Sequence, residues 1–430
     1  MAAKQSSDVV IVGAGLIGLS AAFYLNEAGY QVTVIERDQI GSGASRGNAG
    51  EITPLTAVPL AGPGMMSEVF AGMFSRSGPL TLTPLRALSL TTFGLGFMKA
   101  SLKSQTARGV AAMTQLGAGA LAAFDELEDA GVTLDGGGWG FLYTATTTQK
   151  VQLFHQLLCE RADAGIGPSP EPIVSGAALR ELEPTLSEEC AAGFVDPGAR
   201  WIDPSRMIDS LGAILRERGV TFLEGARVTG IHPGGRPRLD MVHAGTREVI
   251  DGARIVLAAG AWSEELVRPF GVHLGVVPGK GYSFTVGVDR MPGRLIHLAD
   301  ARTVLVPMSD RLRVVGAMEI DGTYETFHAD RIEMIERVTA PFVTGIRWSE
   351  RSEEWVGPRP MTADGLPIIG EHRKLPGVIL ATGHNMHGLS LGPVTGKAVA
   401  ALVQGRGLEL GGRRVEVAKF SPNRLRRLLA

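Results

Sequence analysis

Cysteine is scarce in this chain, since Cys159 and Cys190 are the only two among 430 residues. So few thiols exclude a disulfide framework and are typical of a reducing compartment. The sequence also contains no CxxC pair and no Cys/His cluster at metal-ligand spacing, so we expect no metal site. Because the first apolar run lacks the cleavage pattern of a signal peptide, we expect a cytoplasmic protein.

Excess charge of either sign is absent as well. The formal net charge of −2 leaves no basic field for nucleic acid, which we exclude as a partner. The length exceeds that of one ordinary domain, so two closely joined domains are expected. Nothing in the composition indicates an oligomeric state.

Charged residues are nearly absent between residues 52 and 98, where the only ones are Glu68, Arg76 and Arg86. Prolines interrupt this apolar stretch too often for a membrane-spanning helix. Two interpretations stay open. The stretch is either a lid or packing segment, or a patch that lies on the inner face of the cell membrane and meets a lipid-soluble electron acceptor.

Residues 8–37 have the pattern of a strand, a glycine loop, a helix and a second strand that ends in an acid. In the loop, Gly13 would allow a tight turn, Gly15 would let amides approach a pyrophosphate, and Gly18 would let the helix pack on the strand. The phosphates would lie at the helix N-terminus, and Glu36 would accept hydrogen bonds from ribose hydroxyls. The unit therefore predicts a dinucleotide site rather than an ordinary glycine turn.

Strand and helix patterns continue along the chain. We expect helices over residues 109–130, 151–164 and 204–218, and short strands over 140–144, 192–195, 220–223, 282–286, 295–298, 303–306 and 312–316. Two buried strands, 254–257 and 377–383, each run into a turn of small residues. The fold class is α/β, a Rossmann-like domain (residues 1–50, 200–275 and 350–430) with an inserted α+β substrate domain (51–199 and 276–349) whose sheet is mostly antiparallel.

The small-residue turns favour a flavin over a nicotinamide cofactor. A tightly held FAD needs several backbone segments along an extended molecule, and this chain offers them at its start, middle and end. A nicotinamide enzyme would leave the second and third of these segments unexplained. Because the first histidine is His155, no N-terminal histidine tethers the flavin, and we expect non-covalent binding.

Four motifs carry a family resemblance: Gly41-Ser-Gly-Ala-Ser-Arg-Gly-Asn-Ala-Gly50, Lys280-Gly-Tyr-Ser283, the run from Trp355 to Gly370, and Gly383-His-Asn-Met-His-Gly388. In order and spacing the sequence resembles the D-amino-acid dehydrogenase branch of the glycine oxidase and D-amino-acid oxidase superfamily, over nearly its whole length. The resemblance implies hydride transfer from the α-carbon of an amino acid to flavin N5. The imine is then hydrolysed to the 2-oxo acid, and the electrons pass to a quinone or another carrier.

Three residues are the catalytic candidates. Arg359 is the first, because a buried substrate carboxylate demands a fixed bidentate cation. It also matches the carboxylate-binding arginine in the Arg-Pro motif of glycine oxidase-like enzymes, although a structural ion pair with Glu353, Glu354 or Asp364 is the alternative. Tyr282 is expected to contact substrate or the flavin face, or else to be a core tyrosine. His387, on a glycine loop together with His384, is expected to orient substrate or to be a structural hydrogen-bonder.

The cofactor candidates follow the order of the chain along the nucleotide. The pyrophosphate and ribose end is assigned to Gly13, Gly15, Leu16, Ile17, Gly18 and Glu36, and the continuation toward the ring to Arg37, Ser45, Asn48, Ala49 and Gly50. The resemblance places Val228 at the adenine, followed by Ala259, Gly260 and Trp262. Near the ring's pyrimidine end we expect Gly388, Leu389, Ser390 and Thr395, where a helix N-terminus would face negative charge.

Other functions stay open. One is the oxidation of a cyclic secondary amino acid such as D-proline or D-hydroxyproline, and another is a glycine- or sarcosine-type oxidase that makes hydrogen peroxide. Glycine oxidases place an arginine where Met386 aligns, which weighs against that last reading. A different class is a flavin-carrying subunit that serves electron relay or assembly.

Overall fold

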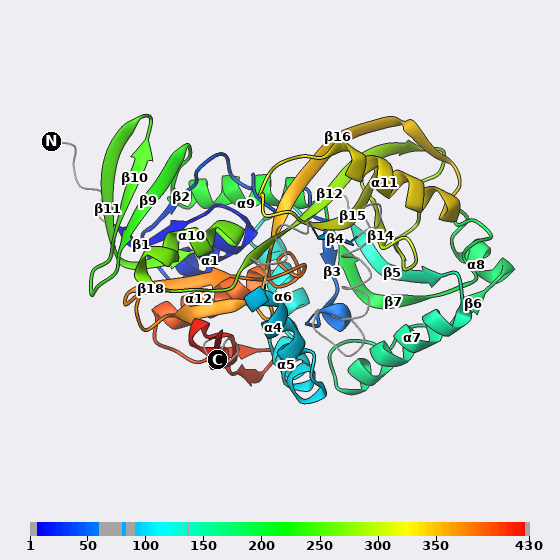
Figure 1. The fold of residues 1–430 in the computed structure, drawn as a ribbon, viewed down its shortest axis with the longest axis horizontal. Coiled ribbons are helices and arrows are strands. Elements are labelled where there is room, and N and C mark those ends of the chain that lie inside the picture. Colours follow the sequence, from blue (N-terminus) through cyan, green and yellow to red (C-terminus); the bar gives the residue numbers. More distant parts are fainter. Residues whose placement is uncertain (1–6, 60–79, 83–90, 136, 426–430) are drawn as a thin grey trace.

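The structure is a computed structural model that describes residues 7–59, 80–82, 91–135 and 137–425. Two large sheets lie next to each other, one at the left and one at the right of Figure 1. Much of the apolar stretch, including Glu68, Arg76 and Arg86, lies outside the described residues. The α/β class with a second, mostly antiparallel sheet is confirmed.

The first sheet is built around the predicted strand–loop–helix–strand unit. Its order is β17(Ile368–Glu371), β18(Val378–Thr382), β11(Thr246–Leu257), β1(Ser7–Val12), β2(Val32–Ile35) and β8(Thr221–Leu223). All neighbours pair in parallel except the edge strand β17. A hairpin of β9(Ala226–His232) and β10(Arg238–His243) extends from β11. The carboxyl ends of β1, β2, β11 and β18 therefore meet at one edge.

Both faces of this sheet are buried, because alternate strand residues belong to different cores. Val9, Ile11 and Val34 pack with the helices α1(Leu16–Glu27), α9(Pro204–Glu217) and α12(Gly392–Val403). Val10 and Ile255 pack on the other side against the β9–β10 hairpin and residues after α10(Ser263–Val267). This alternation follows from the period of two in a strand.

The second sheet has the order β16(Ile346–Met361), β12(Val277–Val288), β15(Leu312–Ile320), β14(Thr303–Pro307), β13(Leu295–Leu298), β5(Gly138–Ala145), β7(Ala192–Trp201) and β3(Glu51–Ile52). Along this path only β13 and β5 run parallel, and β4(Leu80–Leu82) adds a parallel pair with β15. The helix α7(Thr148–Asp163) packs on one face through Val151 and Leu158. The helix α11(Ala329–Thr339) packs on the opposite face through Ile332 and Ile335.

One expected helix is wrong. Residues 109–130 do not form a single helix but parts of two, α5(Lys103–Gly117) and α6(Ala120–Asp129). The chain breaks at Ala118 and Gly119, where glycine is a poor helix former and its Cα lies against Leu410. The break lets α5 join the cluster formed by α12 and the residues after it, while α6 contacts α12 and also reaches the core beside α1.

The two sheets also differ from the division into domains that we expected. The boundary at residue 350 falls inside β16, which pairs with β12 to Met361 and so belongs to the second sheet. The helices α5 and α6, expected in the substrate domain, pack with the helices of the first sheet. For β16 and for the two helices, contacts between residues far apart in the chain decide which sheet the segment packs against, and chain order does not. The domain boundaries stay a prediction.

Candidate functional site

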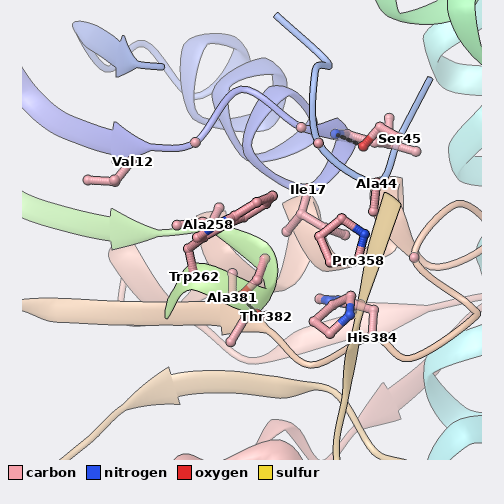
Figure 2. Close-up of a pocket in the computed structure, with 18 of the residues that line it drawn as sticks. Val12, Ile17, Ala44, Ser45, Ala258, Trp262, Pro358, Ala381, Thr382 and His384 are labelled. Atoms are coloured by element: carbon pink, nitrogen blue, oxygen red, sulfur yellow. Dashed lines mark hydrogen bonds between the residues drawn. The ribbon is translucent and has the colours of Figure 1, made fainter. Parts of the chain in front are cut away.

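A long pocket opens at the carboxyl edge of the first sheet, where the second sheet meets it. It encloses about 1500 Å³ when the open space at its mouth is included. Its lining residues fall within 12–17, 35–38, 43–48, 226–228, 258–266, 358–360 and 381–389. Figure 2 shows Val12, Ser45, Trp262, Pro358 and His384 around it. Segments from the start, middle and end of the chain thus share one extended cavity.

The glycine loop has the close packing that the motif predicts. A Cβ at Gly18 would overlap the carbonyl oxygen of Gly13, so only glycine lets α1 start directly on β1. At the start of α1, the Leu16 amide donates to Ser45 Oγ over 3.1 Å. The Ala14 amide donates to Glu36 Oε2 over 2.8 Å, which fixes this acid at the mouth of the loop. The helix N-terminus and the carboxylate lie where a pyrophosphate and a ribose would bind.

One end of the pocket is aromatic and charged. The Arg37 guanidinium lies 4.5 Å from the ring centroid of Trp262, and both residues line the pocket. Val228 and Leu266 add apolar walls beside them. This end adjoins Glu36 and therefore suits the adenosine half of a dinucleotide.

At the other end, His384 and Arg359 face the same cavity. His384 Nε2 is 2.9 Å from Thr395 Oγ1, and its buried Nδ1 has no hydrogen-bond partner. Burial lowers the pKa of His384 to about 3, so the ring is neutral at physiological pH. The helix α12 begins just beyond Leu389 and directs its positive N-terminal dipole to this end.

The Arg359 guanidinium supplies a positive charge at this end of the pocket. Its Nη1 donates to the carbonyl oxygen of Ala317 over 3.0 Å, and within the described part of the chain it forms no ion pair. The three carboxylates proposed as alternative partners bind elsewhere: Glu353 lies 3.8 Å from Arg313, Glu354 2.7 Å from Arg351, and Asp364 2.8 Å from Arg424. Burial lowers the pKa of Arg359 to about 10, which leaves it cationic at neutral pH.

The guanidinium of Arg359 lies flat on the neighbouring strand. A Cβ at Gly281 on β12 would fall on its central carbon and its terminal nitrogens. Gly281 pairs with Gly357 across the two strands, so neither strand places a side chain there. The missing side chain at Gly281 leaves the space that Arg359 fills beside the cavity, and the one missing at Gly357 leaves the space that the Trp355 ring fills.

Most of the predicted cofactor residues line this pocket: Gly13, Gly15, Leu16, Ile17, Glu36, Arg37, Ser45, Asn48, Val228, Ala259, Gly260, Trp262, Gly388 and Leu389. The others lie outside the lining. Gly50 packs on the Ile202 carbonyl, Ser390 Oγ donates to the Glu51 carbonyl over 2.8 Å, and Thr395 bonds His384. Ala49 packs against the core under α7.

Two predicted catalytic residues do not line the pocket. Tyr282 is fully buried and donates to Glu319 Oε2 over 2.6 Å on the opposite face of β12 from Gly281. The interpretation of Tyr282 as a substrate or flavin contact is therefore corrected, because a strand turns successive side chains to opposite faces. His387 Nε2 lies 2.9 Å from the Val58 carbonyl, as expected of a structural hydrogen-bonder.

Several lining residues were not assigned a role from the sequence, namely Pro358, Thr382, His384 and Met386. His384 was recognised only as a neighbour of His387 on the glycine loop. The conformation of the loop decides which of the two rings faces the pocket, and Asn385 between them has a φ of 53°. Pro358 could have been found from the sequence, because it directly precedes the Arg-Pro motif formed by Arg359 and Pro360.

An extended pocket that begins at a strand–glycine loop–helix unit and ends against a second sheet is typical of a dinucleotide-dependent oxidoreductase. Comparison with known proteins makes this specific. The FAD dependent oxidoreductase family, DAO, matches residues 8–402. The chain belongs to this family, and FAD is its cofactor.

Similar proteins cover nearly the whole chain. A protein of Methylobacterium radiotolerans named D-amino acid dehydrogenase is 28% identical over 96% of this chain and 99% of its own length. Glycine oxidase from Geobacillus kaustophilus has a TM-score of 0.71 at 25% identity, over 97% of this chain and 98% of its own. L-proline dehydrogenase from P. horikoshii has a TM-score of 0.74 at 17% identity, over 99% of each chain, which shows the fold alone.

The pocket fits FAD on its own features. Three separated parts of the chain line it, and an acid lies beside the glycine loop. Its far end holds a neutral imidazole and a guanidinium; among the described residues, the imidazole Nδ1 has no hydrogen-bond partner and the guanidinium no carboxylate partner. An adenosine at the Trp262 end and a flavin ring at the His384 end would use each of these groups.

We predict that Gly18→Ala reduces the flavin content of the purified protein by about tenfold or more, because the new methyl group forces α1 away from β1. Flavin absorbance per chain measures it. The matched control is Gly117→Ala in α5, where a Cβ would have no atom within 4 Å. Equal flavin content in Gly18→Ala and the native protein would contradict the packing role.

Proposed function

We propose that this protein is a D-amino-acid dehydrogenase, which oxidises the α-carbon–nitrogen bond of a D-amino acid to an imine that water then hydrolyses. The observation that carries the proposal is the partly buried Arg359 guanidinium, which faces the pocket and has no carboxylate partner in the described structure. A substrate carboxylate would supply the missing charge. The relatives named D-amino acid dehydrogenase, which match over nearly their full length, support the same reaction.

The residues of the pocket bind and orient more than they transfer protons. Arg359 would hold the carboxylate, and its bond to the Ala317 carbonyl would keep the guanidinium plane fixed. FAD, when bound, supplies the acceptor of the hydride from the α-carbon. His384 is neutral, and its free Nδ1 is available as a hydrogen-bond partner at the ring end. The low dielectric of the site favours the neutral amine, which is the form that can lose hydride.

Two alternatives share this geometry. A cyclic secondary amino acid such as D-proline or D-hydroxyproline would place its carboxylate on Arg359 in the same way. A glycine- or sarcosine-type oxidase is less favoured, because the side chain at the rim of the pocket is the apolar Met386 and not a second cation. A flavin subunit without its own substrate would leave the Arg359 charge unexplained.

Anaerobic titration of the flavin-loaded protein tests the proposed function. We predict that D-amino acids bleach the flavin absorbance while their L-enantiomers do not, because one enantiomer can present both carboxylate and α-hydrogen correctly. D-proline, glycine and sarcosine belong in the same panel. Bleaching by none of them would contradict the proposal and favour a relay subunit, and bleaching by glycine or sarcosine alone would favour the oxidase.

Substitution of Arg359 tests the carboxylate site. We predict that Arg359→Ala raises the KM of the bleaching substrate by about thirtyfold or more with unchanged flavin content, since a buried charge pair loses one partner. Gly281→Ala should have a similar effect because its Cβ displaces the guanidinium. Gly117→Ala serves again as the control. An unchanged KM in both variants would remove Arg359 from the substrate site.

The pH dependence of the same site follows from the Arg359 cation. Burial lowers its pKa to about 10, so the charged form is complete at neutral pH and is lost as the pH rises through that value. Binding of an amine-free carboxylate such as benzoate, followed by flavin difference spectra, should therefore hold constant to about pH 9 and weaken above it.

We also propose a quinone as electron acceptor and a peripheral membrane contact through residues 52–98. The support comes from α4(Thr91–Ala100), where Leu95 and Met98 are 62% and 43% exposed and, three residues apart, lie on one side of the helix. Among the described residues, no helix is long and apolar enough to cross a membrane. A surface contact is the mode that such a patch supports.

We predict that the native protein co-sediments with vesicles of phosphatidylglycerol and phosphatidylethanolamine, and that Leu95→Glu with Met98→Glu abolishes this binding while leaving the flavin content intact. The matched control is Leu153→Glu with Leu157→Glu on α7, an equally exposed apolar pair at 65% and 43%. Loss of binding in the control as well, or no binding by the native protein, would contradict the assignment to residues 52–98.

A further inference from the structure

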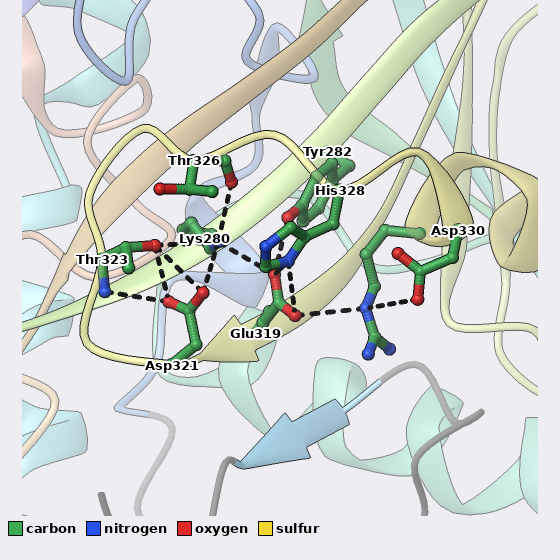
Figure 3. Close-up of polar contacts among 9 residues, drawn as sticks. Lys280, Tyr282, Glu319, Asp321, Thr323, Thr326, His328 and Asp330 are labelled. Carbon is green, nitrogen blue, oxygen red and sulfur yellow. Dashed lines mark hydrogen bonds and ion pairs between the residues drawn. The ribbon is translucent and has the colours of Figure 1, made fainter.

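A buried polar cluster occupies the face of β12 opposite Gly281 (Figure 3). Its centre is Lys280, which is 0% exposed. The Lys280 ammonium lies 2.8 Å from Asp321 Oδ2, 3.0 Å from Glu319 Oε2, 3.1 Å from Thr323 Oγ1 and 2.8 Å from the Thr326 carbonyl oxygen. Three of these four acceptors belong to one loop, residues 321–328, between β15 and α11.

The two carboxylates of the cluster are already paired with Lys280. Glu319, Asp321 and His328 together have the composition of a metal site, but Lys280 Nζ already contacts both carboxylates. Arg331 and Tyr282 add further donors to Glu319. Burial alone would raise the pKa of Glu319, but its interactions with Tyr282, Lys280 and His328 lower it. A buried ammonium is costly unless its hydrogen bonds are satisfied, so the loop and the lysine hold each other in place.

The same loop reaches the FAD pocket with its middle residues. The Tyr324 ring stacks on the Trp262 ring at a centroid distance of 5.4 Å and an interplanar angle of 18°. Glu325 Oε1 accepts from Arg37 Nη2 over 2.6 Å. Trp262 and Arg37 both line the pocket at its adenosine end. The loop therefore holds in place Trp262 and Arg37, two residues that would contact the cofactor.

Tyr324 also interacts with the carboxylate of Glu265, which lines the pocket. Burial and the neighbouring Glu265 carboxylate, itself a lining residue, raise the pKa of Tyr324 to about 12. The column Tyr324–Trp262–Arg37 is thus held by a stack, a cation–π contact and an ion pair. Such contacts fix side-chain rotamers that would otherwise lose entropy when a ligand binds.

We propose that loop 321–328 is a clamp for the adenosine half of FAD, and that Lys280 is the positioning residue that anchors it. Tyr324 and Glu325 preorganise Trp262 and Arg37, and Lys280 determines where Tyr324 and Glu325 lie. The second sheet would then contribute to cofactor affinity as well as to the substrate site. The inference rests on the assignment of the Glu36 end of the pocket to adenosine, and not on the identity of the substrate.

The test uses the full-length protein stripped of FAD and titrated with FAD and with ADP, which carries only the adenosine end. Binding is followed by quenching of flavin fluorescence and by calorimetry. Tyr324→Ala and Lys280→Met are expected to raise the Kd of both ligands by the same factor, about tenfold, because both disorder the same contacts. At saturating FAD, the KM of the substrate should stay within about twofold of the native value.

Three controls separate the clamp from a general loss of stability. Tyr324→Phe keeps the stack and should bind FAD like the native protein, and Glu333→Gln on the exposed side of α11 should change nothing. If Lys280→Met does not fold, Asp321→Asn and Thr323→Val remove two acceptors singly and should weaken ADP in the same direction.

Native-like affinity for ADP in a folded Tyr324→Ala protein would overturn the clamp. Weaker FAD binding with unchanged ADP binding would also overturn it, since the loop would then act at the ring end. A protein that no amino acid bleaches would refute the proposed function and leave these affinities as they are.

Discussion

A partly buried guanidinium with no carboxylate partner among the described residues is the constraint around which the site is organised. Burying a charge costs free energy unless polar groups compensate it, and among the described residues the Arg359 guanidinium donates only to the Ala317 carbonyl, at 3.0 Å, and to the Met318 sulfur, at 3.9 Å. A glycine is required at 281 because the cation lies flat on that part of β12, where a Cβ would overlap it. A ligand that brings its own carboxylate would relieve the charge, which is why the proposed reaction begins with an amino acid and not with an amine alone.

The strand β12 links the two halves of the molecule through its alternation. On one face, Gly281 supports Arg359 and Ser283 Oγ donates to the Gly47 carbonyl, next to the cofactor segment 43–48. On the other face, Lys280 and Tyr282 meet the acids of β15 and the loop that follows it. One strand thus connects the substrate end of the pocket with the loop that reaches the adenosine end. In the proposed function, the first sheet would bind the dinucleotide, and the second sheet would hold the substrate and part of the cofactor.

Local patterns predicted a large part of this arrangement. The order strand, glycine loop, helix and acid over residues 8–37 has a short-range cause, and its helix and strands appear close to the expected residues. The N-cap Asp203, followed by proline, starts α9 as expected, because its side chain accepts from the Ser205 and Arg206 amides. The break within residues 109–130 was not predicted, because the helical spacing of apolar residues continues across Gly117 and Gly119 although the helix does not. The spacing of apolar residues does not show whether a segment forms one helix or two short helices that pack against different neighbours.

The amino-acid sequence by itself determined the dinucleotide unit, the family and the residue types that a carboxylate and a flavin require, because these depend on spacing along a few neighbouring residues. The tertiary structure decided which of them meet. Only the folded chain shows that Arg359 is free of Glu353, Glu354 and Asp364, that His384 and not His387 lines the pocket, and that Tyr282 points away from it. The physical reason is that side-chain direction depends on sheet register and loop conformation, which are set by contacts between residues far apart in the chain.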